Sequence, residues 1–203
     1  MTFTEKKFQI RSLEGISAKS IEEHLKLYAG YVKHSNLILE KITELGQDSE
    51  KNAFALGEVQ RRFGFEFDGM RNHEYYFEQF EGDAAAALSA DSDLGKAIAA
   101  EWGSFDGWLA RFKVIAMTRG VGWAALYYDP MTGRLLNTWV EEQHLGHLTG
   151  LKVILALDMW EHSYMLDYVP SEKKKYVEAF FANIDGKIVE KRFADAVSQG
   201  KAE

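Results

Sequence analysis

A short segment near residue 160 holds two side chains that can bind a metal ion. Asp158 ends a run of apolar residues, and His162 follows four positions later in a turn that also contains Trp160. A carboxylate and an imidazole are ligands for iron, manganese and zinc, and they need no sulfur. Two ligands alone make a poor site for a redox metal, so the pattern predicts that further ligands come from elsewhere in the chain.

Two histidines in helical patterns are the best candidates for those further ligands. His24 lies in an apolar stripe with three- and four-residue spacing, in a helix that begins at Ser20 or at Ser17. His73 lies in a second such stripe, and facing helices of a hairpin can direct side chains to a shared centre. A lone histidine on an apolar helix face is more often a hydrogen-bonded core residue, so a structural role for both stays open.

Two other histidine patterns compete with this set. Glu141 and His144 have the Glu-x-x-His spacing of di-iron helical bundles, but such a site needs a second copy, and the chain has none. His144 and His147 form a possible zinc pair, although a glycine lies between them and no third ligand is evident. The chain lacks Gly-x-Ser-x-Gly and Gly-x-x-x-x-Gly-Lys, which argues against a serine hydrolase and a phosphate-loop enzyme.

The composition limits what else the chain can be. Its 203 residues are 46% hydrophobic and include no cysteine, so a buried core is expected, whereas disulfides, thiolate zinc sites and iron–sulfur clusters are excluded. A net charge of −7 argues against nucleic-acid binding. No apolar stretch approaches the roughly 18–20 residues of a membrane span. The N-terminal segment lacks the apolar core of a signal peptide, so a cytoplasmic location is expected.

The order of the patterns predicts an α+β fold that begins with a helical hairpin. A small, polar segment at Gly82–Asp93 interrupts the helical patterns and is the expected boundary between an N-terminal domain at 1–82 and a C-terminal domain at 92–203. In the second domain we expect a small antiparallel sheet, with a β-hairpin at 121–140 and a further strand at 152–157. Helices are expected at Leu94–Trp102, Phe105–Arg119, Ser171–Phe181 and Ile184–Val197.

Four motifs, in the same order, resemble those of the iron/manganese superoxide dismutases. Asp158-Met-Trp-Glu-His-Ser-Tyr164 looks like the family's Asp-x-Trp-Glu-His-Ala-Tyr signature, and Asn72-His73-Glu-Tyr-Tyr-Phe77 is similar to its Asn-His-x-x-Tyr-Trp segment. The segment from Ser17 to His24, followed by Tyr31, resembles the helix of the first ligand. Gly120-Val-Gly-Trp123 resembles the entry to the family's sheet. The resemblance covers most of the chain.

The resemblance implies a superoxide dismutase, an oxidoreductase with one iron or manganese ion per subunit. The implied ligands are His24, His73, Asp158 and His162, at the junction of an N-terminal helical hairpin and an α/β domain with a three-stranded antiparallel sheet. The ion would cycle between trivalent and divalent states and convert superoxide to dioxygen and hydrogen peroxide. The alternative is an inactive or metal-binding relative of the same fold that acts as an interaction module.

The resemblance also implies a glutamine or histidine that hydrogen-bonds the metal-bound solvent. Many iron-type members supply a glutamine four residues before the second ligand, where this chain has Gly69. Other members supply it from the second domain, and Gln143 is the best match there, with His144 and Glu142 as alternatives. This arrangement favours manganese or the use of either metal.

Other implied positions concern the substrate funnel and the subunit contact. Tyr31, or else Tyr28, resembles the tyrosine at the funnel, while Trp123 and Trp160 are expected to form an aromatic shell. Glu161 matches the glutamate that reaches the last histidine ligand of a partner subunit, so a homodimer or a tetramer is implied. The expected substrate is a small anion, with no nucleic-acid or membrane partner. Because the protein is acidic, attraction of that anion has to be local.

Overall fold

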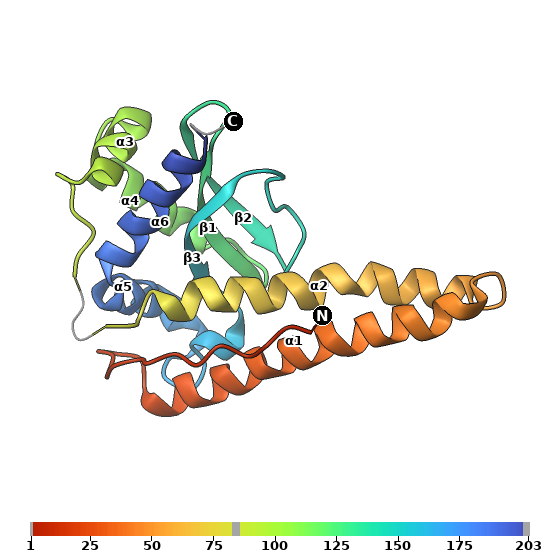
Figure 1. Cartoon of the computed structure of the whole chain (residues 1–203). Helices are drawn as coiled ribbons and strands as arrows, with labels where there is room; N and C mark the ends of the chain where they lie inside the picture. The colour runs from red at the N-terminus through yellow and green to blue at the C-terminus, as the bar shows by residue number, and fades with distance from the viewer. Residues whose placement is uncertain (1, 83–85, 201–203) are drawn as a thin grey trace.

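The computed structural model describes residues 2–82 and 86–200 and places a long helical hairpin beside an α/β part (Figure 1). The hairpin consists of α1 (Ala18–Leu45) and α2 (Ala53–Glu78), joined through the 3₁₀ turn η1 (Gly46–Asp48). Buried residues of α1, including His24, recur at helical spacing on one face, as the apolar pattern predicts.

The first helix begins at Ala18, one turn before the Ser20 start. Ser17 has an extended backbone, and its side chain accepts a hydrogen bond of 3.1 Å from the backbone N–H of Ser20. Ser20 lies inside the helix, and its buried hydroxyl has no hydrogen-bond partner among the residues that the structure describes. The alternative start at Ser17 is therefore confirmed, and the start at Ser20 is wrong because Ser17 already caps the free amides.

The α/β part contains a three-stranded antiparallel sheet with strand order β2-β1-β3. Helices precede and follow the three strands along the chain. This order confirms the predicted α+β class. The elements are α3 (Asp93–Trp102), α4 (Phe105–Ala116), β1 (Gly122–Asp129), β2 (Arg134–Glu141), β3 (Lys152–Asp158), α5 (Lys173–Asn183) and α6 (Gly186–Gly200). The helix predicted to reach Arg119 ends at Ala116, because the chain turns there to enter β1 through Gly120, which has a φ of 137°.

The central strand β1 is buried along nearly its whole length. Helices α4 and α6 pack against it, α6 also contacts β3, and α2 of the hairpin packs on β3. Figure 1 shows the hairpin running past one end of the sheet. The carboxyl end of β3 therefore points toward the two long helices, and this junction is where residues of both parts can meet.

The predicted boundary segment lies between the hairpin and α3. Its residues 83–85 lie outside the described residues; beyond them Ala86 forms an isolated parallel bridge with Asp185. The division into domains at 1–82 and 92–203 stays a prediction. In the described ranges, none of the helices has the length and apolarity needed to cross a membrane.

Candidate metal centre

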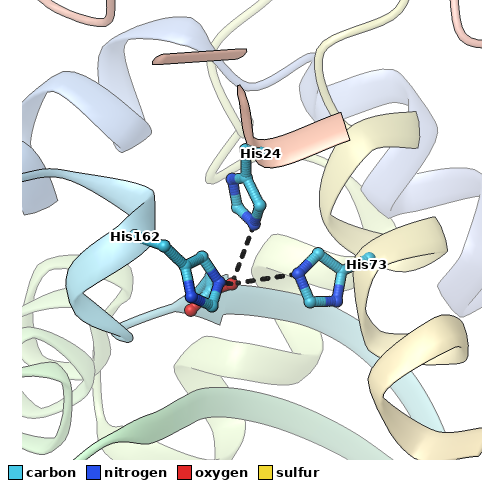
Figure 2. Close-up of side chains that lie close together, drawn as sticks. His24, His73 and His162 are labelled. Carbon is cyan, nitrogen blue, oxygen red and sulfur yellow. Dashed lines mark hydrogen bonds and ion pairs between the residues drawn. The ribbon is translucent and has the colours of Figure 1, made fainter. Parts of the chain in front are cut away.

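Four side chains from four elements converge where the hairpin meets the sheet. His24 comes from α1, His73 from α2, Asp158 from the end of β3 and His162 from the 3₁₀ turn η2 (Glu161–Ser163), and Figure 2 shows the three rings turned toward one centre. One donor atom from each residue lies within 4.8 Å of the others. Ligands on opposite sides of one ion lie roughly 4 Å apart, so the cluster has the size of a single coordination sphere.

One carboxylate oxygen is shared by the three rings. The Nε2 atoms of His24, His162 and His73 lie 3.1, 3.2 and 3.6 Å from Oδ2 of Asp158. The other oxygen, Oδ1, accepts a hydrogen bond of 2.8 Å from the backbone N–H of Trp160. Because the backbone holds one oxygen, the carboxylate keeps the other directed at the histidines.

His73 is held in the tautomer that leaves its inner nitrogen free to bind a metal. Its Nδ1 lies 2.6 Å from the backbone carbonyl of Gly69, which can only accept, so Nδ1 carries the proton. Its Nε2 is buried and has no hydrogen-bond partner within residues 2–82 and 86–200. Buried polar atoms nearly always have partners, and a lone pair on imidazole suits a metal ion. The residues present therefore fit one ion.

The protonation states of the cluster also suit metal binding. Burial lowers the pKa of His24 and lowers that of His73 well below its usual value. Burial opposes ionisation of Asp158, but the neighbouring His162 and His24 outweigh it and hold the pKa of this carboxyl below its usual range. Neutral imidazoles and an ionised carboxylate are the forms that ligate metals.

Metal-free protein should lose stability as the pH falls below about 6.5, the ordinary pKa of histidine. The unfolded chain takes up protons at His24 and His73 there, while the folded chain keeps both neutral to lower pH. Each group then removes up to about 1.4 kcal/mol of stability per pH unit. Urea unfolding of metal-free protein across this range tests the slope. A His24→Gln/His73→Gln variant should give a flatter profile, and equal slopes would contradict the prediction.

The buried side-chain amide of Gln143 links two aromatic side chains beside the cluster. The indole Nε1 of Trp123 donates to Oε1 of Gln143 over 2.9 Å, and Nε2 of Gln143 donates to the Tyr31 hydroxyl oxygen over 2.9 Å. Because an indole can only donate, the orientation of the amide is fixed. The hydroxyl oxygen of Tyr31 is then an acceptor for Gln143, and its own proton remains available to a further acceptor. Burial, and the charge of Asp158, raise the pKa of Tyr31, so the hydroxyl stays protonated.

His144, an alternative to Gln143, and Tyr28, the alternative to Tyr31, make contacts elsewhere. The ring of His144 packs edge-on against Phe65, with 5.6 Å between ring centroids. The hydroxyl of Tyr28 accepts from the backbone N–H of Lys6 in the N-terminal segment and donates to the carboxylate of Glu74 on α2. Of the candidates from the sequence, the structure thus brings Gln143 and Tyr31 to the cluster. The histidine pair 144 and 147 is not brought to a common centre, because both ring nitrogens of His147 face other partners.

Trp123 and Trp160 each lie against a histidine ring of the cluster. The ring of Trp123 lies edge-on to His73 with 5.1 Å between centroids, and that of Trp160 is stacked on His162 at 5.7 Å. The side chain of Glu161, next to His162, is exposed. Sequence reasoning missed a second group behind Gln143: Asn72, Tyr127 and His147. Asn72 and His147 each occur in a pattern noted above, but nothing in the sequence indicates that the three side chains meet, because they come from α2, β1 and a loop.

Gly69 leaves room for the Tyr31 ring. A Cβ added at Gly69 would lie 2.6 Å from Cδ1 of Tyr31, far inside van der Waals contact. A Gly69→Ala variant should therefore displace the ring, lengthen the bond to Gln143 and destabilise the protein by about 1–3 kcal/mol. Urea unfolding measures the change. Gly57→Ala is the matched control on the same helix, since nothing described lies within 4 Å of its added Cβ; it should stabilise by up to about 1 kcal/mol.

Comparison with known proteins places this geometry in a family. Residues 90–192 match the model of the C-terminal domain of iron/manganese superoxide dismutases. The chain is 38% identical over 188 residues to a superoxide dismutase [Fe] of Cupriavidus metallidurans, which covers 91% of this chain and 92% of that protein. The chain belongs to the iron/manganese superoxide dismutase family.

Further relatives in the superoxide dismutase family are named for both metals. A superoxide dismutase [Mn] 2 of Halobacterium salinarum is 35% identical over 177 residues, which are 87% of this chain and 84% of that protein. A superoxide dismutase [Fe] of Aquifex pyrophilus is 31% identical over 201 residues, which are 95% of this chain and 91% of that protein. Because the match to the Aquifex pyrophilus protein covers 95% of this chain, it includes both the hairpin and the sheet.

Proposed function

We propose that the chain is a superoxide dismutase, which converts superoxide to dioxygen and hydrogen peroxide with one iron or manganese ion per subunit. The convergence of four donor atoms within 4.8 Å, in a chain of this family, carries the proposal. His24, His73, Asp158 and His162 would hold the ion. When bound, such an ion supplies one-electron chemistry, because it alternates between trivalent and divalent states.

The chain's own residues hold the ligands and present protons. The backbone N–H of Trp160 holds the carboxylate of Asp158, and the carbonyl of Gly69 holds the ring of His73. Formation of peroxide consumes protons, and the hydroxyl proton of Tyr31 lies beside the cluster on a neutral phenol. Gln143 holds this hydroxyl by donating to its oxygen. The rings of Trp123 and Trp160 would limit the entry of water.

Purified protein loaded separately with iron and with manganese tests the function. Metal content should reach about one ion per subunit, the number that four ligands of this size hold. Superoxide consumption should follow in at least one loaded form. Full metal content with no superoxide consumption in either form would contradict the proposal and favour the inactive relative that acts as an interaction module.

We expect activity with manganese, or with either metal. Gln143 reaches Tyr31 from the second half of the chain, while Gly69 has no space for a side chain on α2. A hydrogen bond to the site from an outer residue tunes the redox potential of a bound metal. Activity in the iron-loaded form alone would contradict this expectation.

We also propose a homodimer in which Glu161 reaches the partner's copy of the site. Glu161 is exposed beside His162, and the following segment exposes three large apolar side chains, Met165, Leu166 and Val169. Exposed apolar patches mark association surfaces. Sedimentation should give a dimer, or a tetramer built from dimers, and a monomer would contradict the proposal. A cytoplasmic location stays a prediction that cell fractionation tests.

A further inference from the structure

His147, which is not one of the four clustered residues, holds the loop that carries Gln143. Nε2 of His147 lies 3.1 Å from the backbone carbonyl oxygen of Gln143. The side-chain amide of Asn72 donates to the same oxygen over 2.9 Å. On its other side, Nδ1 of His147 lies 2.5 Å from the hydroxyl of Tyr127, a buried residue of β1. The histidine therefore links the sheet to the loop.

The partners of His147 indicate which atom carries each proton. Nε2 lies 3.3 Å from the amide nitrogen of Asn72, but that nitrogen already donates to the carbonyl oxygen of Gln143. The nearer contact of Nε2, at 3.1 Å, is to this oxygen, which can only accept, so we assign the hydrogen to Nε2, which donates it to Gln143. In a neutral imidazole Nδ1 is then an acceptor, and Tyr127 donates its hydroxyl proton to it. Burial raises the pKa of Tyr127, which keeps that proton in place. A tyrosine hydroxyl can donate or accept, so Tyr127 holds the ring of His147 in the tautomer that the carbonyl of Gln143 requires.

The backbone next to Gln143 is in a conformation that requires such support. Glu142 has a φ of 51°, in the left-handed region that non-glycine residues rarely adopt. Its carbonyl oxygen accepts a hydrogen bond of 3.1 Å from Nε1 of Trp160. Two consecutive carbonyls, of Glu142 and Gln143, are therefore each bonded to side-chain donors. A strained conformation persists where its surroundings determine it this fully.

We propose that His147, oriented by Tyr127, is a positioning residue that keeps the amide of Gln143 between Trp123 and Tyr31. This inference rests on the proposed function, in which Gln143 acts at the metal site. The amide accepts one hydrogen bond and donates another, both 2.9 Å long, and lengthening either by about 1 Å would break it. Release of the carbonyl would permit such lengthening.

The test compares His147→Phe with His147→Gln in metal-loaded protein. Phenylalanine keeps a ring but removes both nitrogens, whereas glutamine can place an amide donor near the position of Nε2. In a crystal structure of His147→Phe, the separation of Gln143 Nε2 from the Tyr31 hydroxyl should exceed about 3.5 Å. The rate of superoxide consumption should fall roughly fivefold to tenfold, with an altered electron paramagnetic resonance spectrum of the metal. His147→Gln should restore most of the rate and the spectrum.

The outcomes separate this inference from the proposed function. An unchanged Gln143–Tyr31 separation in His147→Phe overturns the positioning role, and so does His147→Gln with the same defect as His147→Phe. A displaced amide with an unchanged rate leaves the positioning role intact and overturns the role of Gln143 in the proposed function.

Two further variants complete the test. Leu145→Ala alters an exposed side chain of the same loop and should leave rate and spectrum unchanged. If His147→Phe fails to fold, Tyr127→Phe removes a single hydroxyl, and it should shift the spectrum in the same direction with a smaller fall in rate. An unchanged spectrum in Tyr127→Phe would overturn the part assigned to Tyr127.

Discussion

A His162→Ala variant is expected to bind little metal and to lose superoxide-consuming activity. His162 supplies one of the four donor atoms, with its Nε2 3.2 Å from the shared oxygen of Asp158. Loss of an outer hydrogen-bond partner already costs roughly 10–100-fold in metal affinity or activity, and loss of a ligand should cost more. Elemental analysis after purification, together with a superoxide-consumption assay, measures both effects. The ring is 21% exposed, so the substitution removes little of the core.

A second histidine provides the matched control. His34 lies on α1, its side chain is 53% exposed, and the carboxylate it faces is that of Glu66 at 3.7 Å. His34→Ala should keep the metal content and the activity of the wild type. A His162→Ala protein with full metal content would disprove the ligand assignment, and a metal loss in His34→Ala as large as that in His162→Ala would show that the assay reports general damage.

The helices and the strand that carry His24, His73 and Asp158 could be predicted from the sequence, because the formation of each element depends on local periodicity. His24 and His73 occupy the inward face of amphipathic helices, and Asp158 ends an apolar strand. Their convergence is a different matter, since it depends on how α2 packs against β3. The order of several motifs shared with a family supplied that information, whereas no single motif could.

The choice among Gln143, His144 and Glu142 could not be made from the sequence. Successive side chains point in different directions, and the direction at this point is set by the left-handed backbone of Glu142. A glutamate carries no local signal for that conformation, because glycine or asparagine is the usual residue there. The two side chains that bond the carbonyl of Gln143, those of Asn72 and His147, are 75 residues apart in sequence, and α3, α4, β1 and β2 lie between them.

The choice between Tyr31 and Tyr28 has a similar cause. Both face inward on α1, so helical periodicity alone does not separate them. Tyr28 is engaged by the N-terminal segment through the N–H of Lys6, while Tyr31 occupies the space left by Gly69 on the facing helix. Contacts between segments distant in sequence decide which hydroxyl reaches the metal cluster.

A Gln143→Leu variant is expected to keep its metal and to lose activity by roughly 10–100-fold, the usual effect of removing a partner just outside the ligands. Leucine has a similar size but cannot accept from Trp123 or donate to Tyr31. The hydroxyl of Tyr31 is then no longer held in place. The buried indole N–H also loses its partner, which should cost about 1–3 kcal/mol of stability. Superoxide consumption per bound metal and urea unfolding measure the two effects separately.

Gln79→Leu distinguishes a role at the site from a role in folding. Gln79 is also fully buried. Its amide donates to the backbone carbonyl of Ala156 over 2.8 Å and accepts from the backbone N–H of Ala156 over 3.1 Å. Its other partners are the carbonyl of Tyr76 and the guanidinium of Arg192, so the amide joins α2, β3 and α6. Gln79→Leu should therefore lower stability at least as much as Gln143→Leu while leaving the rate per bound metal near that of the wild type. A Gln143→Leu protein with the wild-type rate per metal would overturn the role of this amide. Of the two amides, that of Gln143 bonds the Tyr31 hydroxyl beside the clustered histidines, so equal losses in both variants would mean that the rate follows the stability of the fold.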